Sequence, residues 1–104
     1  MKIAFDLDNT VYSQGTTDKK YTDAVVRPYM IEYVNKLYDD GHEIYFYTAR
    51  HFNYFIFTDN QLKKDGFKYH GLILGKFNYD LLIDDRALRF SGNTDIIDDI
   101  IKEL

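Results

Sequence analysis

KIAFDLDNT, residues 2–10, is the stretch that decides the fold of this chain. Four of its first six residues are apolar, which indicates a short buried strand. The turn-forming residues Asp6, Asp8 and Asn9 end that strand. The sequence therefore predicts two carboxylates at the carboxyl end of a buried strand.

Three further apolar runs predict more strands, at residues 43–47, 71–75 and 81–83. A polar group follows each of them, in order Thr48, Lys76, and the pair Asp84 and Asp85. Because the carboxyl ends of parallel strands share one edge of a sheet, we expect these side chains to meet.

Three other stretches have the periodicity and the end signals of helices. The first helix is expected to lie between Pro28 and Gly41. The second is expected to start at the capping pair Thr58 and Gln61 and to end at Gly66. Asn93 or Thr94 is expected to cap the last helix. Strands and helices thus alternate along the chain, which is typical of an α/β fold with a parallel sheet.

With 104 residues, the chain is expected to be a single domain, residues 1–104, without a cap domain. We predict a three-layer sandwich whose Rossmann-like, mainly parallel sheet is covered on both faces. Only about six residues, 75–80, join the last two apolar runs, whereas a parallel crossover normally needs a dozen or more. One of those two runs is therefore expected to be irregular.

Two segments carry no clear period. Residues 11–26 are polar and rich in turn-forming types, and we interpret them as an irregular flap. Residues 52–57 form an aromatic cluster that could be core, lid or interface. Core is the favoured interpretation, and a homodimer through this cluster is the alternative.

Composition and charge exclude several classes of protein. Lys and Arg total 13 against 17 Asp and Glu, a net charge of −4, which argues against a nucleic-acid-binding surface. The absence of cysteine excludes disulfides, thiolate zinc sites and a cysteine nucleophile. No stretch approaches the roughly 18 apolar residues of a membrane span, and the opening residues are not a signal segment, so we expect a cytoplasmic protein with no membrane partner.

A cation is expected where the strand ends meet, because carboxylates brought into one pocket repel each other. The candidate metal ligands are Asp6, Asp8, Asp84 and Asp85. The three histidines have no metal-ligand spacing, and oxygen ligands alone favour a hard ion such as Mg²⁺. Such an ion would attract a phosphoryl group.

In their order and strand placement, these motifs resemble those of the haloacid dehalogenase-like (HAD) superfamily of phosphohydrolases. Residues 5–10 resemble its first motif, 47–50 the second, 75–76 the third and 83–85 the fourth. The match runs from residue 1 to about residue 90. The short length and the segment IDDRAL, residues 83–88, further resemble small capless capsule-biosynthesis phosphatases and similar phage proteins.

The resemblance implies a role for each motif. Asp6 would be the nucleophile that forms an aspartyl-phosphate, and Asp8 would be the general acid and base. The implied phosphate-binding residues are Thr48, Lys76, Asn9 and Arg50, and the implied Mg²⁺ site comprises Asp6, Asp8, Asp84 and Asp85. Asn9 stands where many members of the superfamily have glycine, and for Arg50 a surface ion pair is an equally open interpretation.

We therefore expect an Mg²⁺-dependent phosphatase that hydrolyses a small phosphate monoester, such as a phosphosugar or a nucleotide. The main alternative is a non-hydrolytic phosphoacceptor or phospho-ligand-binding module of signalling type. Receiver domains lack an acid two residues after the nucleophile, whereas Asp8 stands there in this chain. A sugar-nucleotide transferase is a weaker alternative, because 104 residues scarcely provide a donor and an acceptor site.

Overall fold

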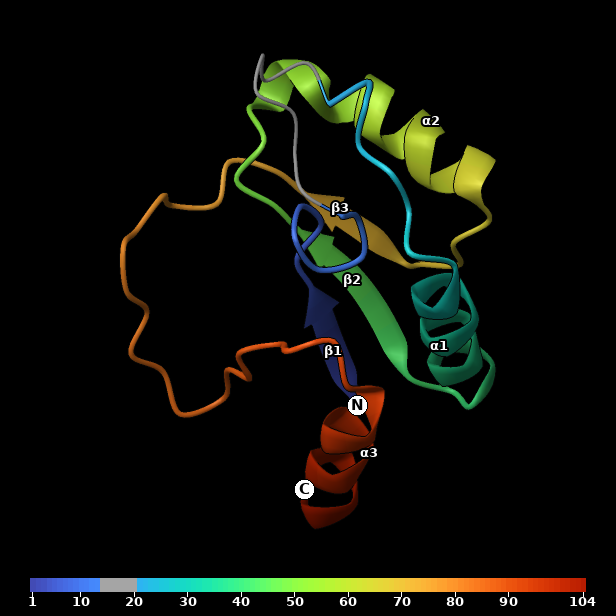
Figure 1. The fold of residues 1–104 in the computed structure, drawn as a ribbon, viewed down its shortest axis with the longest axis vertical. Coiled ribbons are helices and arrows are strands. Elements are labelled where there is room, and N and C mark those ends of the chain that lie inside the picture. The colour runs from blue at the N-terminus through green and yellow to red at the C-terminus, as the bar shows by residue number, and fades with distance from the viewer. Residues whose placement is uncertain (14–20) are drawn as a thin grey trace.

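The first strand, β1 (Lys2–Phe5), forms one edge of a three-stranded sheet in the computed structural model, which describes residues 1–13 and 21–104 (Figure 1). The other strands are β2 (Glu43–Tyr47) and β3 (Gly71–Ile73). Their spatial order is β1-β2-β3, and both pairings are parallel. The predicted α/β fold with a parallel sheet and no cap domain is confirmed.

The core lies on one face of this sheet. Phe5 is paired in register with Phe46, and Ile3 with Ile44, so these four side chains point to the same side. They pack against two helices, α1 (Pro28–Asp39) and α2 (Phe55–Asp65), whose buried residues include Met30, Val34, Leu37 and Leu62. The opposite face carries Tyr47 and Ile73, which are exposed.

The first helix has the limits that its sequence predicts. Pro28 occupies the first turn, where its missing N–H leaves no hydrogen bond unmade. Asp40 caps the end of α1, and Gly41 follows with φ +98°, a left-handed conformation that favours glycine.

The second helix starts earlier than predicted. It begins at Phe55, after the short 3-10 helix η1 (Phe52–Tyr54), and Gly66 ends it with φ +93° as expected. Thr58 and Gln61 do not form a capping box, because both side chains accept hydrogen bonds from Arg50.

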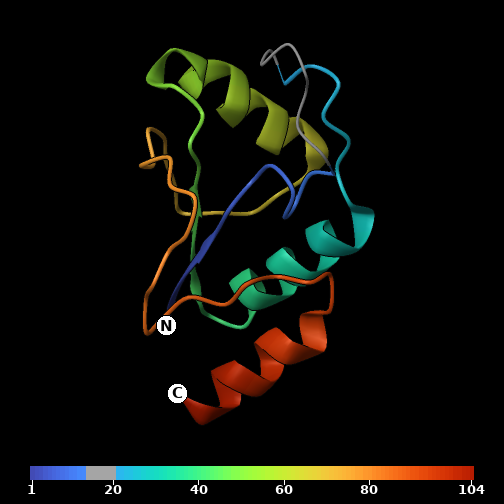
Figure 2. The same ribbon diagram turned by 60° about the vertical axis from the view of Figure 1, so that its left-hand side comes forward.

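The last helix, α3 (Thr94–Glu103), begins as predicted with Asn93 as its cap, since Asn93 Oδ1 accepts from the N–H of Asp95 at 2.9 Å. It lies alongside α1 (Figure 2), and the hydroxyl of Tyr33 donates to Asp98 Oδ1 at 2.7 Å. Ile97 and Ile101 of α3 are partly buried and pack against the core.

The prediction of a fourth strand at residues 81–83 is wrong, and the expectation that one of the last two apolar runs is irregular is confirmed. Residues 75–93 connect β3 to α3 with no helix or strand, and they form a wide loop on the β1 side of the sheet (Figure 1). The reason lies in the short link at residues 75–80, which does not give this chain a normal parallel crossover back to its own sheet.

The favoured prediction that residues 52–57 belong to the core is also wrong. Phe52, Phe55 and Ile56 are exposed, because this segment turns along the rim of the sheet as η1 and the first turn of α2.

Part of the expected flap, residues 14–20, lies outside the described residues. Its two ends are joined, because the N–H of Ser13 donates to Val25 O at 2.7 Å and the N–H of Arg27 donates to Val11 O at 2.9 Å.

Candidate active site

A tight loop after β1 positions the two aspartates of the opening stretch. The carbonyl oxygen of Leu7 accepts hydrogen bonds from the N–H groups of Thr10, Val11 and Tyr12, each at 3.0 Å. The side chains of Leu7, Val11 and Tyr12 are fully buried. Because both its backbone and its apolar side chains are held, this loop presents Asp6 and Asp8 in a fixed orientation.

Asn9 lies in this loop with φ +68°, in the left-handed region. Among residues with a side chain, asparagine adopts this conformation most readily, and glycine does so freely. This backbone requirement accounts for an asparagine at this position.

Asp6 is partly buried at the carboxyl end of β1. Its Oδ1 accepts from the N–H of Leu7 at 2.9 Å. Burial raises the pKa of Asp6 above its ordinary value of 3.8, although the positive charge of Lys76 and the hydrogen bond from Leu7 act in the opposite direction. Asp6 is thus a partly buried carboxylate with the positive charge of a lysine nearby.

Thr48 and Lys76 lie side by side at the ends of the neighbouring strands. The N–H of Lys76 donates to Thr48 O at 3.0 Å, which continues the pairing of β2 with β3. Thr48 is buried, and its hydroxyl accepts from the N–H of Arg50 at 3.2 Å. A hydroxyl that accepts one hydrogen bond can still donate its own proton to a ligand.

The ammonium group of Lys76 lies 5.2 Å from the ring centre of Tyr47 and 5.5 Å from that of Tyr79. These cation–π contacts hold the side chain at the same edge of the sheet as Asp6. Of the predicted site residues, the structure therefore brings together Asp6, Asp8, Thr48, Arg50 and Lys76. Asn9 lies in the same loop as the two aspartates, and it is exposed.

Arg50 does not take the position expected of a phosphate ligand. It is only 1% exposed, and its guanidinium binds Asp8 through two hydrogen bonds, Nε to Oδ2 at 3.0 Å and Nη2 to Oδ1 at 2.8 Å. Its Nη1 donates to Thr58 Oγ1 at 3.1 Å and to Gln61 Oε1 at 2.8 Å. We therefore replace the predicted phosphate-binding role of Arg50 by that of a positioning residue for Asp8.

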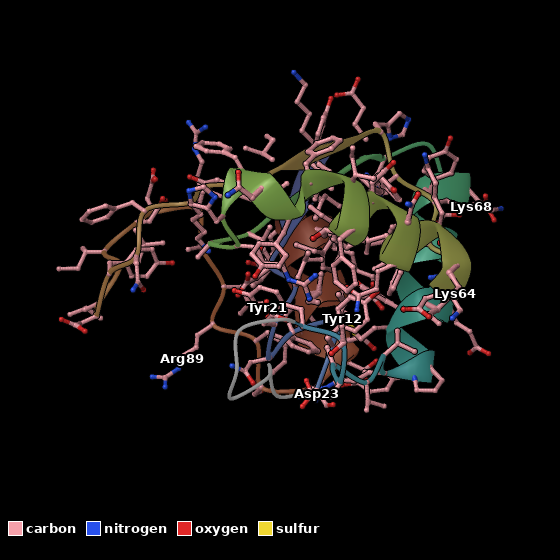
Figure 3. All side chains as sticks on the ribbon, turned by 90° about the horizontal axis from the view of Figure 1, so that it is seen from above. Tyr12, Tyr21, Asp23, Lys64, Lys68 and Arg89 are labelled. Atoms are coloured by element: carbon pink, nitrogen blue, oxygen red, sulfur yellow. The ribbon has the colours of Figure 1, made fainter. Side chains whose placement is uncertain are left out.

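Two tyrosines complete the surroundings of this guanidinium. Its central carbon lies 4.2 Å from the ring centre of Tyr21 and 5.7 Å from that of Tyr12, and both tyrosines lie beside α2 (Figure 3). The hydroxyl of Tyr12 donates to Asp65 Oδ2 at 2.7 Å, which joins the loop after β1 to the end of α2.

Asp84 and Asp85 do not join this group within one chain. Both are exposed on the segment between β3 and α3, where Asp84 Oδ1 accepts from the N–H of Arg86 at 2.7 Å. Over residues 1–13 and 21–104, no cluster of three or more acidic or histidine side chains could hold a metal ion. The described residues of a single chain therefore do not supply the donor set predicted for Mg²⁺.

Sequence reasoning missed Thr58, Gln61 and Tyr21 as partners of Arg50. The only local signal was the spacing of Thr58 and Gln61 on one helical face, which equally fits a capping box. Their convergence on one guanidinium depends on how α2 lies over the sheet.

The arrangement can perform two chemical tasks. A partly buried carboxylate can attack an electrophilic phosphorus, and Lys76 with the Thr48 hydroxyl can stabilise the charge on the transferred group. The carboxylate of Asp8, which Arg50 holds in place, can accept a proton from water.

Comparison with known proteins gives structural information. No family model matches the chain, and no curated protein matches it. A crystal structure of a Vibrio cholerae protein, whose name states no activity, has a TM-score of 0.76 and 26% sequence identity, and the match covers 98% of this chain and 97% of the other. The α/β fold is thus shared with a solved structure over nearly its whole length.

None of the helices in the described part of the chain is long and apolar enough to span a membrane.

Proposed function

We propose that this protein is a phosphatase that hydrolyses a small phosphate monoester through an aspartyl-phosphate on Asp6. The observation that carries the proposal is the convergence of Asp6, Thr48 and Lys76 at the carboxyl ends of three adjacent parallel strands. These residues stand at the positions of the first three HAD-like motifs, which are far apart in the sequence. A phosphosugar or a nucleotide is the class of substrate we infer.

In the first step, a carboxylate oxygen of Asp6 forms a bond to phosphorus while the bond from phosphorus to the leaving oxygen breaks, and Asp8 donates a proton to that leaving oxygen. Lys76 and Thr48 stabilise the transferring phosphoryl group. In the second step, water attacks phosphorus, Asp8 accepts its proton, and Asp6 is released with inorganic phosphate.

The Mg²⁺ requirement and a cytoplasmic location remain predictions within this proposal. The described residues of a single chain contain no cluster of three or more acidic or histidine side chains that could hold the ion.

The test is phosphate release from sugar phosphates, nucleotides and an aryl phosphate, with and without Mg²⁺. We expect Asp6→Asn to abolish turnover and Asp8→Asn to reduce it by about 10²- to 10⁴-fold. Asp99→Asn, an exposed change on α3, is the matched control and should leave turnover unchanged. Turnover that survives Asp6→Asn would refute the nucleophile assignment.

One observation favours the non-hydrolytic alternative. Both carboxylate oxygens of Asp8 accept hydrogen bonds from Arg50, so both oxygens that a general acid would use are already engaged within the chain. A phosphoacceptor has no need of that acid. Acetyl phosphate distinguishes the two functions: intact-mass detection of one phosphoryl group per chain, lost in Asp6→Asn and without phosphate release from any monoester, would favour the phosphoacceptor.

A further inference from the structure

Residues 75–93, here called the arm, expose an apolar run that the rest of the described chain does not cover. Leu81, Leu82 and Ile83 are 77%, 45% and 89% exposed. Phe77 and Leu88 of the arm are exposed as well. Contiguous apolar residues that remain in water mark a surface that binds a partner.

The sheet has a complementary feature in its β1 edge. In the part of the chain that the structure describes, β1 pairs with β2 on one side only. A strand edge offers unpaired N–H and C=O groups, which another strand can occupy. The arm stands off from this same side of the sheet (Figure 1).

The arm cannot easily reach the β1 edge of its own chain. The chain leaves the carboxyl end of β3, and a parallel neighbour of β1 must start at the opposite end of the sheet, beyond β2 and β1. Residues 75–80 are the only link, about half the length of a normal parallel crossover. A strand from another molecule is free of this limit, because it can approach the edge from outside.

We propose that the arm binds a second copy of this chain, in which residues 81–83 pair in parallel with β1. The exchange is reciprocal, so that each copy gives one arm and receives one, as in a two-fold domain-swapped dimer. The catalytic consequence rests on the proposed function, whereas the pairing itself does not.

Parallel pairing places the residues after position 83 at the same sheet edge as Asp6 and Asp8. Asp84 and Asp85 of the second copy then lie beside the two aspartates of the first, and one chain completes the oxygen ligands for Mg²⁺ in the other. This explains why the described residues of a single chain contain no such cluster.

The exchange would cover apolar surface that is exposed in the single chain. The arm has five exposed large apolar residues, and the rest of the chain also exposes Tyr47, Phe52 and Ile73. A stable interface uses about 20–30 residues on each side, and in a reciprocal exchange each copy contributes both its arm and the strand edge that the other arm covers.

The first measurement is the mass in solution by sedimentation equilibrium, for which we expect a dimer. Ile83→Lys should give a folded monomer, with circular dichroism confirming the fold, because the side chain is exposed in the single chain. Leu104→Lys is the matched control, since Leu104 is 85% exposed outside the arm, and it should remain a dimer. A monomeric wild-type protein at high concentration would overturn the proposal.

The second measurement tests the shared site. Asp6→Asn and Asp84→Asn chains with different tags are co-expressed, and the heterodimer is isolated by tandem purification. We expect neither homodimer to bind Mg²⁺ in calorimetry, and the heterodimer to bind one ion per two chains, half the wild-type amount. A heterodimer that binds no Mg²⁺, or a homodimer that retains binding, would overturn the shared site.

The two proposals fail in distinguishable ways. A dimer that restores Mg²⁺ binding in the heterodimer but hydrolyses no monoester would refute the phosphatase and leave the exchange intact. A wild-type monomer that hydrolyses a monoester would refute the exchange and leave the phosphatase intact.

Discussion

The buried guanidinium of Arg50 is expected to be a main source of stability at the candidate active site. Arg50→Met removes two hydrogen bonds to Asp8, one to Thr58 and one to Gln61, while it retains most of the apolar volume. It also leaves the Asp8 carboxylate, 21% exposed, without its cation.

The magnitude follows from the burial of this pair. Breaking a buried ion pair costs about 3–5 kcal/mol, whereas an exposed pair contributes about 0–1 kcal/mol. The arginine side chain is 0% exposed and the aspartate is partly exposed, so we expect a loss of about 3 kcal/mol in the free energy of unfolding. For a domain of this size, that corresponds to a fall of roughly 12–24 °C in Tm.

The assay is urea unfolding followed by circular dichroism at pH 7, with Lys64→Met on the exposed side of α2 as the control. In an Asp8→Asn background, Arg50→Met should cost less by about 1–2 kcal/mol, because the orphaned charge is already gone. A cost below about 1 kcal/mol in the wild-type background, or an equal cost in both backgrounds, would refute the assigned positioning of Asp8 by Arg50.

Three other predictions concern the site and its surroundings. Because burial raises the pKa of Asp6 in the folded protein, the free energy of unfolding should fall as pH rises through that pKa. Asp6→Asn should therefore raise Tm at pH 7 and flatten this part of the curve of Tm against pH. A curve that is unchanged in Asp6→Asn would contradict this prediction. Gly75 has φ +77°, and a Cβ there would lie 2.5 Å from the Phe52 ring, so Gly75→Ala should cost about 1–3 kcal/mol in urea unfolding. Part of that cost should disappear in a Phe52→Ala background, and a full cost there would show that the ring is not responsible. Asn93→Ala should lower the free energy of unfolding by about 1 kcal/mol through loss of the cap on Asp95, and no change would show that α3 does not depend on this cap.

The sequence by itself determined the elements whose signals are local. The apolar run before Asp6, the aromatic strand at residues 43–47, Gly41 after α1 and the Asn93 cap all predicted what the structure contains. Each depends on residues within one or two turns of each other, so periodicity and end signals suffice. The proximity of Thr48 and Lys76 was also predictable from the sequence, because a parallel sheet brings the ends of its strands to one edge.

Only the tertiary structure decided where Arg50 points and whether residues 81–83 form a strand. The partners of Arg50 come mainly from α2 and from the loop after β1. How these two segments pack cannot be predicted from the residues next to Arg50 in the sequence. Residues 81–83 have the composition of a strand, but a strand exists only if an edge can be reached, and the link at residues 75–80 limits that reach. Whether a segment pairs in the sheet thus depends on the chain that connects it to the sheet, whereas its β propensity depends only on its own residues.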